Sequence, residues 1–156
     1  MDVIIRRIAA ILLVVQCVVI FAFSAQPAET SSKTSKSVTK KIVRMVPAMK
    51  HKSEKTVDKK AKELEHTIRK IAHFSLYLLL GVFAYLTSDG YLKKNTLWFA
   101  LLFCLLYAAS DEFHQLFSPG RSCEFRDVCI DFSGSFCGAL LARGIKKKFK
   151  KRRKKA

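Results

Sequence analysis

Apolar residues are concentrated in four long stretches, and polar residues fill the segments between them. The first stretch runs from Ile8 to Phe23, with Gln16 as its only polar interruption. Together with residues 3–5 it reaches the roughly 20 residues that a helix needs to cross a bilayer. The other three stretches are of similar length, so the pattern predicts an all-α fold, a polytopic membrane bundle of about four transmembrane helices. The predicted spans are residues 4–23, 71–87, 96–117 and 127–145.

The segment between the first two spans, residues 24–70, is rich in Ser, Thr and Lys. In its second part, apolar residues recur at three- and four-residue spacing from Val57 to Ile71. This spacing predicts an amphipathic helix that lies at the membrane interface and continues into the second span. The first part, residues 30–41, lacks such a pattern, and we expect it to be flexible. The chain ends in a Lys-rich run, residues 146–156.

Composition narrows the class of protein. The chain of 156 residues is 50% hydrophobic yet carries 29 Lys and Arg against 12 Asp and Glu, a formal net charge of +17. This length is about one domain, which leaves no room for a large soluble enzyme beside the spans. The Lys-rich runs contain almost no aromatic residues, which argues against nucleic acid as a partner. Membrane lipids are the expected partners, because a basic tail attracts anionic lipid, although the tail can also serve only to fix topology.

Lys and Arg close to the ends of the spans predict the orientation. Arg6 and Arg7 precede the first span directly, whereas the next basic residue after it is Lys33. Basic residues flanking a span favour the cytoplasmic side, and the first span usually dominates. The basic residues of the segment between the first two spans argue the other way, but most of them lie far from a span. The predicted topology is residues 1–7 inside, 24–70 outside and 146–156 inside the cell.

The first span is also compatible with a secretory signal peptide. It has a basic start, an apolar core and small residues between Ser24 and Ala28, where a signal peptidase would cleave. Its core is somewhat long for a signal peptide, so we expect a retained span. The later spans keep their orientation in either case.

Ionisable residues gather at the predicted extracytoplasmic ends of the last three spans. Such residues are costly inside a membrane and usually face a bundle interior or water. Helical spacing places Lys70, His73 and Tyr77 on one face, and Asp127 and Asp131 on another. The gathered residues are Lys70 and His73 of the second span, Asp111, Glu112, His114 and Gln115 of the third, and Arg121, Arg126, Asp127 and Asp131 near the fourth.

This mixture of groups is suited to an anionic ligand. Cations such as Lys70 and Arg121 can hold a phosphate or carboxylate head group while a carboxylate or the imidazole of His73 moves a proton. The alternative is that the groups pair with each other and only tie the helices together. No tight ligand motif such as HExxH is present, so we predict no metal and no cofactor. The candidate ligand-binding residues are Lys70, His73, Asp111, Glu112, Gln115, Arg121, Asp127 and Asp131. The candidate catalytic residues, if the protein is an enzyme, are His73, Asp111, Glu112 and Asp127.

Several separated polar motifs carry a resemblance to a known family. They are SAQPAETSSKTS, IRKIAHFSLYLLLG and SDEFHQLFSPGRSCEFRDVCIDFSGSFCGALLA. In order and spacing these motifs resemble the VanZ-like family of small bacterial membrane proteins, named for a member associated with teicoplanin resistance. The resemblance implies one membrane domain over residues 8–142. It implies recurring polar or glycine positions at Ser24, Gln26, Pro27, Ser31, Arg69, Lys70, His73, Tyr77, Gly81, Asp111, Glu112, Gln115, Pro119, Gly120, Arg121, Asp127, Asp131, Gly134 and Gly138. Leu76 departs from the pattern, since many relatives carry Glu there, and this weakens a mechanism that needs a carboxylate beside His73.

The resemblance implies a multi-pass protein of the bacterial cell membrane. Our first hypothesis is a cell-envelope factor that modulates glycopeptide (teicoplanin) susceptibility by binding an envelope component or the drug at the outer face. The alternative is a membrane enzyme that acts on a lipid-linked phosphate or a cell-wall precursor at the outer leaflet. The paired motifs typical of membrane lipid phosphatases are absent, and whether the protein catalyses a reaction stays open. Ion passage is less favoured, because the inner half of the bundle lacks polar residues to continue a path.

Two glycines of the fourth span and one turn support two further predictions. Gly134 and Gly138 form a GxxxG pair on the fourth span, which predicts close helix packing within the bundle rather than dimerisation. The run 118–120, Ser-Pro-Gly, predicts a tight turn that directs Arg121 back to the polar residues. Cys123 lies between two spans, and we expect its thiol to be exposed on the outer side.

Overall fold

The structure, a computed structural model, describes residues 3–92 and 94–153, and within these residues it contains helices and no strands. The predicted all-α fold is therefore confirmed. Four of its helices, α1, α3, α4 and α5, are long and apolar enough to cross a membrane. The helices are α1 (Val3–Ser24), α2 (Ala28–Met45), α3 (Glu54–Tyr91), α4 (Thr96–Gln115) and α5 (Phe125–Arg153), with a short 3-10 turn at Pro47–Met49.

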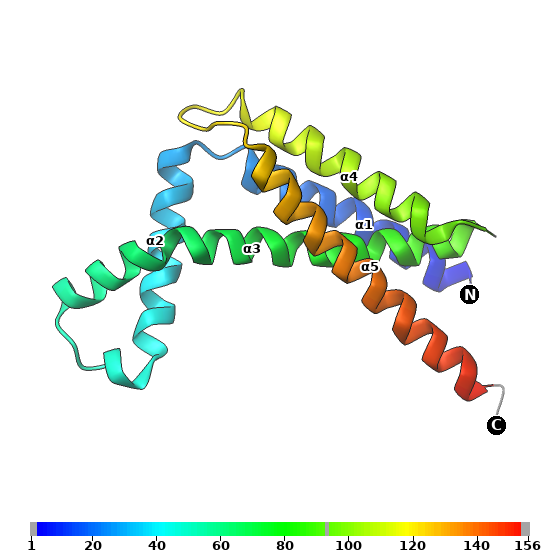
Figure 1. The fold of residues 1–156 in the computed structure, drawn as a ribbon, viewed down its shortest axis with the longest axis horizontal. Helices are drawn as coiled ribbons and strands as arrows, with labels where there is room; N and C mark the ends of the chain where they lie inside the picture. Colours follow the sequence, from blue (N-terminus) through cyan, green and yellow to red (C-terminus); the bar gives the residue numbers. More distant parts are fainter. Residues whose placement is uncertain (1–2, 93, 154–156) are drawn as a thin grey trace.

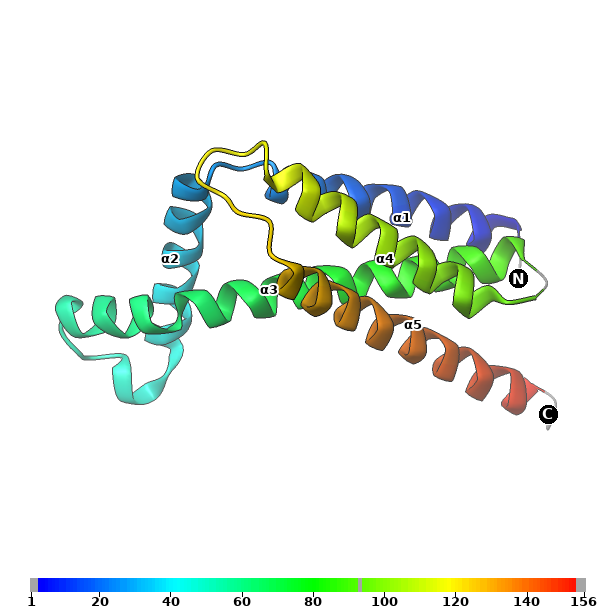
Figure 2. The ribbon, with the colours of Figure 1, turned by 45° about the horizontal axis from the view of Figure 1, so that its top comes forward.

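The four long helices run side by side, and α2 lies across one end of them (Figures 1 and 2). We call this end, which also carries the loop between α4 and α5, the α2 end. The start of α1 and the end of α5 both lie toward the opposite end (Figure 1). The chain thus crosses the bundle an even number of times. Large apolar side chains cover the outside, as a lipid environment favours; they include Ile4, Ile11, Val18, Trp98, Leu102 and Leu106.

Glycines allow α3 and α5 to pack closely, and these two helices make the most extensive contact of any pair in the described residues. A Cβ atom added to Gly134 would overlap the carbonyl oxygen of Phe74, and one added to Gly138 would overlap that of Leu78. From the other side, Gly81 meets the backbone of Ser135 in the same way. The GxxxG pair of α5 therefore packs against α3 within the chain, as the sequence predicts.

The segment between the first two spans is a helical hairpin rather than a flexible loop. The prediction of a flexible stretch over residues 30–41 is wrong, because α2 covers it. Thr39 and Val43 on α2 are buried, as are Val57 and Ala61 on α3. Polar contacts on both sides fix the antiparallel register of α2 and α3. They are the ion pairs Lys40–Asp58 and Arg44–Glu54 and a hydrogen bond from the Ser32 hydroxyl to Glu65 at 2.7 Å.

The predicted amphipathic helix is the first part of α3, and it continues without a break into the membrane-spanning part. α3 has 38 residues, about twice the number needed to cross a bilayer. Its first half therefore projects beyond the bundle, where it carries α2 (Figure 1). The start of the second span therefore lies toward the same end of the bundle as the loop between α4 and α5 (Figure 1).

Candidate functional site

One ion pair and one contact between a histidine and a carboxylate join α3 to α5 at the α2 end. The ammonium group of Lys70 lies 2.6 Å from a carboxylate oxygen of Asp127. Four residues further along α5, the buried carboxylate of Asp131 lies 3.8 Å from Nδ1 of His73. The two helices run in the same direction, so residues at helical spacing on one helix meet residues at helical spacing on the other. This is why the sequence can place both pairs at one level of the bundle.

The loop between α4 and α5 turns back over this pair of helices. Gly120 has a φ angle of +75°, a left-handed conformation that glycine adopts without strain. The turn is closed by the amide of Arg121, which donates to the carbonyl of Ser118 at 3.2 Å. The carbonyl of Pro119 accepts a hydrogen bond from the amide of Ala28 at the start of α2. The loop is therefore attached to α2 and directs Arg121 inward.

The guanidinium group of Arg121 is held by three neutral acceptors. Its Nε donates to the carbonyl of Gln26 at 3.1 Å, and Nη1 donates to the side-chain oxygen of Gln115 at 3.0 Å. A longer contact of 3.5 Å joins Nη2 to the carbonyl of Phe23. None of these partners carries a charge. The positive charge of Arg121 is thus positioned by α1, α4 and the loop without being neutralised by them.

Glu112 positions Gln115, and through it Arg121, by hydrogen bonds. It is 2% exposed, and its carboxylate accepts a hydrogen bond from the side-chain amide of Gln115 at 2.8 Å. Its other oxygen accepts from the backbone amide of Glu124 at 3.1 Å. Because Gln115 in turn accepts from Arg121, Glu112 fixes the orientation of the Gln115 amide. Glu112 is therefore a positioning residue that links α4 to the start of α5.

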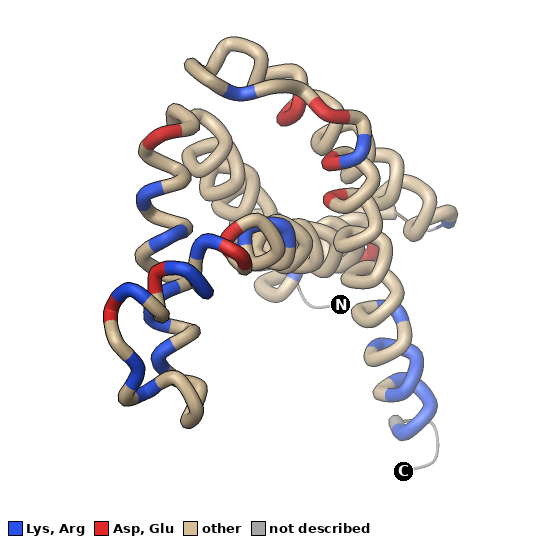
Figure 3. Tube along the Cα trace, turned by 60° about the vertical axis from the view of Figure 1, so that its left-hand side comes forward, with Lys and Arg blue, Asp and Glu red and all other residues tan. Residues whose placement is uncertain are grey.

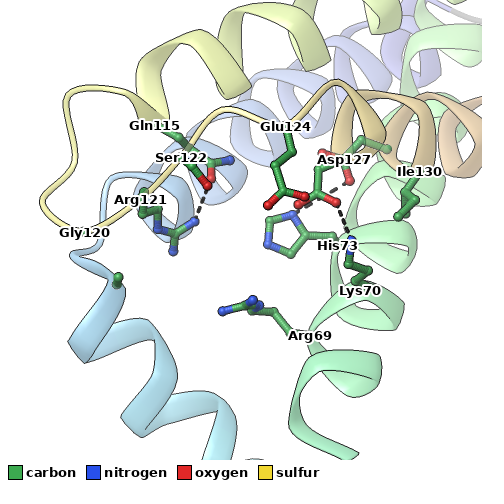
Figure 4. Close-up of a pocket in the computed structure, with 12 residues that line it drawn as sticks. Arg69, Lys70, His73, Gln115, Gly120, Arg121, Ser122, Glu124, Asp127 and Ile130 are labelled. Atoms are coloured by element: carbon green, nitrogen blue, oxygen red, sulfur yellow. Dashed lines mark hydrogen bonds and ion pairs between the residues drawn. The ribbon is translucent and has the colours of Figure 1, made fainter.

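A polar cavity of about 130 Å³ lies between these elements. In Figure 4 the side chains of Arg69, His73 and Arg121 point into it, from α3 and from the loop. Burial lowers the pKa of Arg121, and the nearby positive charge of Arg69 lowers it further. The carboxylates of Asp111 and Glu112 act in the opposite direction on the pKa of Arg121. Two guanidinium groups thus face one cavity. The residues lining the cavity are Ala28, Arg69, Lys70, His73, Gln115, Gly120, Arg121, Ser122, Glu124, Asp127, Ile130 and Asp131.

Neither Arg69 nor Arg121 forms an ion pair with an acidic residue within the described ranges. Two of the acidic residues that line the cavity have partners, since Asp127 pairs with Lys70 and Asp131 faces His73. The carboxylate of Glu124 also faces the cavity (Figure 4), and it forms no ion pair within the described residues. An unpaired cation beside a cavity is an attractive position for an anion, and two guanidinium groups can bind its oxygens through several charge-assisted hydrogen bonds. The cavity is therefore suited chemically to a phosphate or a carboxylate.

Some buried polar atoms beneath the cavity receive no hydrogen bond from the part of the chain that the structure describes. They include both carboxylate oxygens of Asp131, one oxygen of Asp111 and the hydroxyl groups of Tyr77 and Ser24. Buried polar groups without partners are rare in folded proteins. Ser24 and Tyr77 lie close to Asp111, and Asp131 lies beside His73, so these groups form a buried polar cluster next to the cavity.

The structure brings together most, but not all, of the residues predicted to form the site. Six of the eight candidate ligand-binding residues line the cavity, namely Lys70, His73, Gln115, Arg121, Asp127 and Asp131. Asp111 and Glu112 are buried but do not line it. Two further residues of the predicted polar group lie elsewhere. The ring of His114 stacks on Phe21 of α1, with 4.6 Å between centroids, and Arg126 is exposed.

Arg69 is the residue that the reasoning from charge and spacing omitted. Its helical position four residues before His73 would have placed it on the same face, so the spacing contained the signal. The resemblance also marked it as a recurring position. A second expectation needs correction, since Leu76 does not leave His73 without a neighbouring carboxylate. Asp131 provides one from α5.

No group of three or more His, Cys, Asp or Glu residues able to hold a metal ion occurs in the described part of the chain. Cys123 is exposed, as its place between two spans predicts.

Comparison with known proteins places the chain in a family. The model of the VanZ/LLP1 family matches residues 9–147, which include every residue of the cavity. No curated protein and no solved structure matches the chain.

Proposed function

The chain belongs to the VanZ/LLP1 family, and its four apolar helices make it a multi-pass membrane protein. From this premise we propose that it binds an anionic component of the bacterial cell envelope in the cavity at the α2 end. In this proposal the phosphate or carboxylate of that component lies between Arg69 and Arg121. Occupation of the site modulates susceptibility to glycopeptides such as teicoplanin by changing the access of the drug to its target.

The observation that carries the proposal is the pair of guanidinium groups that face one cavity without an acidic partner in the described residues. Burial of Arg121 disfavours its charged form, and the charge of the exposed Arg69 acts in the same direction. A bound anion offsets both contributions, because it is attracted by each arginine and accepts their hydrogen bonds. Arg121 thus ties the loop to α1 and α4 and at the same time presents its charge to the cavity, where an anion can bind.

The charge distribution supports a site on the outer side of the membrane. Lys and Arg cover the last turns of α5, and Arg6 and Arg7 lie at the same end of the bundle (Figures 1 and 3). Basic residues next to spans favour the cytoplasm, which would place the α2 end outside the cell. The hairpin of α2 and α3 is also basic (Figure 3), but most of its basic residues lie away from the ends of the spans. In this orientation the cavity faces the envelope.

One observation favours an enzyme as a second candidate. His73 faces the cavity and lies 3.8 Å from the buried carboxylate of Asp131, an arrangement that can orient an imidazole for proton transfer. Beside two arginines, such a pair is suited to hydrolysis of a lipid-linked phosphate. Release of inorganic phosphate from such a lipid, lost in His73→Gln, would favour the enzyme over the binding protein.

Binding of inorganic phosphate tests the proposed function. We expect Arg69→Gln to weaken binding about tenfold, the effect of losing one charge-assisted hydrogen bond of about 1.5 kcal/mol. The measurement is calorimetric titration of the full chain in phosphatidylcholine nanodiscs. Arg126→Gln is the matched control, because it removes an exposed arginine that does not line the cavity. Equal affinity of the wild type and Arg69→Gln, or an equal loss in the control, would reject the proposal.

A further inference from the structure

A second cavity continues from the polar one. It is a groove of about 420 Å³ between α2 and α3, and its lining is largely apolar. Arg69, His73 and Arg121 line both cavities, so the polar cavity and the groove meet at the two guanidinium groups and the imidazole. A ligand that reached the arginines would therefore have an apolar surface directly beside its charged group.

The groove follows one face of α3. Ile68, Ala72, Leu76 and Leu79 line it at helical spacing, and the distance along the helix axis from the first to the last is about 16 Å. Leu79 lies well inside the apolar part of α3, and its side chain is 44% exposed. The groove thus extends from the charged end of the site to a depth where the surroundings are hydrocarbon.

The opposite wall comes from α2 and the end of α1. Ser31, Thr34, Ser35 and Val38 recur at three- and four-residue spacing on one face of α2, and Phe23 lies at the end of α1. Small side chains on α2 leave width in the groove, while α2 itself is held to α3 by buried contacts and ion pairs. The groove is therefore part of the fold.

We propose that this groove seats the hydrocarbon chain of a membrane lipid whose phosphate head group is held by Arg69 and Arg121. The assignment rests on the proposed function and names the class of its ligand, a lipid-linked phosphate rather than a free anion. Charge complementarity supplies the head-group position, and the continuous apolar lining supplies the position of the chain. A lipid can enter sideways from the bilayer, because the groove reaches the lipid-facing residue Leu79.

The groove determines how a bound lipid is oriented more than how tightly it binds. Lipid tails are as apolar as the side chains of the groove, so transfer of a chain from bilayer to groove brings little driving force. Selection among lipids must then come from the head group. A lipid with a phosphate monoester is attracted by both arginines, whereas a choline head group places a cation beside them. The groove keeps the bound phosphate at a fixed depth in front of His73.

Photolabelling of the full chain in phosphatidylcholine nanodiscs tests the assignment. The probe is a phosphatidic acid with a diazirine in its acyl chain, compared with a phosphatidylcholine that carries the same chain. Labelled residues are mapped by mass spectrometry. We expect the phosphatidic acid probe to label groove residues such as Val38, Ala72 and Leu76 about tenfold more than the phosphatidylcholine probe, the ratio produced by one additional charge-assisted contact.

Two tryptophan variants make the test specific. Ala72→Trp fills the groove without touching the polar cavity, and we expect it to remove the selective labelling while binding of inorganic phosphate is unchanged. Leu102→Trp, on the lipid-facing side of α4, should change neither. Equal labelling by the two probes, or labelling that Ala72→Trp leaves intact, would overturn the groove assignment even if phosphate binding depends on Arg69. Loss of phosphate binding in Ala72→Trp would also overturn it, because the groove and the anion site would then not be separable.

Discussion

Gly138→Leu is expected to remove most of the folded protein from the membrane. The α-hydrogen of Gly138 lies against the carbonyl oxygen of Leu78, and even a Cβ atom there would overlap the backbone of α3. Overpacking of a core costs about 1–3 kcal/mol when side chains can adjust. Here the obstacle is backbone in the most extensive helix contact of the bundle, so we expect a cost at or above the top of this range, a large fraction of the stability of a small domain.

The amount of full-length protein in isolated membranes and its thermal unfolding measure this effect. Gly144→Leu is the matched control on the same helix, because nothing lies within 4 Å of a Cβ atom added at Gly144. Normal accumulation and normal unfolding of Gly138→Leu would contradict the close packing of α3 on α5.

Arg121→Lys is expected to weaken phosphate binding about a hundredfold while the protein still accumulates. The charge is kept, but an ammonium group cannot reproduce the planar fork that bonds Gln26 and Gln115 at once. Losing this positioning together with the contacts to the anion should cost about 3 kcal/mol of binding free energy. The loss exceeds that of Arg69→Gln, because Arg121 also ties the loop to α1 and α4.

Calorimetric titration with phosphate gives the affinity, and the thermal midpoint reports on folding. The control is Arg126→Lys, the same exchange at an exposed position of α5. If Arg121→Lys bound phosphate as tightly as the wild type, the guanidinium group would have no role in recognition. If it failed only because the protein unfolded, the role of Arg121 would be structural.

The sequence predicts the membrane-spanning part of the fold well, because each span carries its own signal. A run of apolar residues of sufficient length marks a helix whatever its neighbours are. The hairpin of α2 and α3 is different. α2 is rich in Ser, Thr and Lys, which gives little local indication of a helix. Its burial of Thr39 and Val43 and its ion pairs with α3 depend on a partner that is distant in the sequence.

The site shows the same division between local and distant information. Helical spacing places Lys70 with His73 on one face of α3 and Asp127 with Asp131 on one face of α5, but the pairing of Lys70 with Asp127 comes from the structure. The Ser-Pro-Gly turn anticipates the direction of Arg121. The spacing of residues along α4 does not show how α1 packs against α4. The sequence therefore grouped His114 with the polar residues, whereas in the structure its ring stacks on Phe21. The groove could not be predicted from the sequence, because one of its walls is α2, a helix that the sequence did not predict.

The most direct measurement of the central claim is the position of an anion in the cavity. Crystals of the full chain soaked in tungstate, a tetrahedral dianion with strong anomalous scattering, locate it without assumptions about the natural ligand. We predict an anomalous peak within hydrogen-bond distance of the guanidinium groups of both Arg69 and Arg121, and its absence in crystals of Arg69→Gln. Anomalous peaks confined to the basic turns of α5, with none between the two arginines, would contradict the claim.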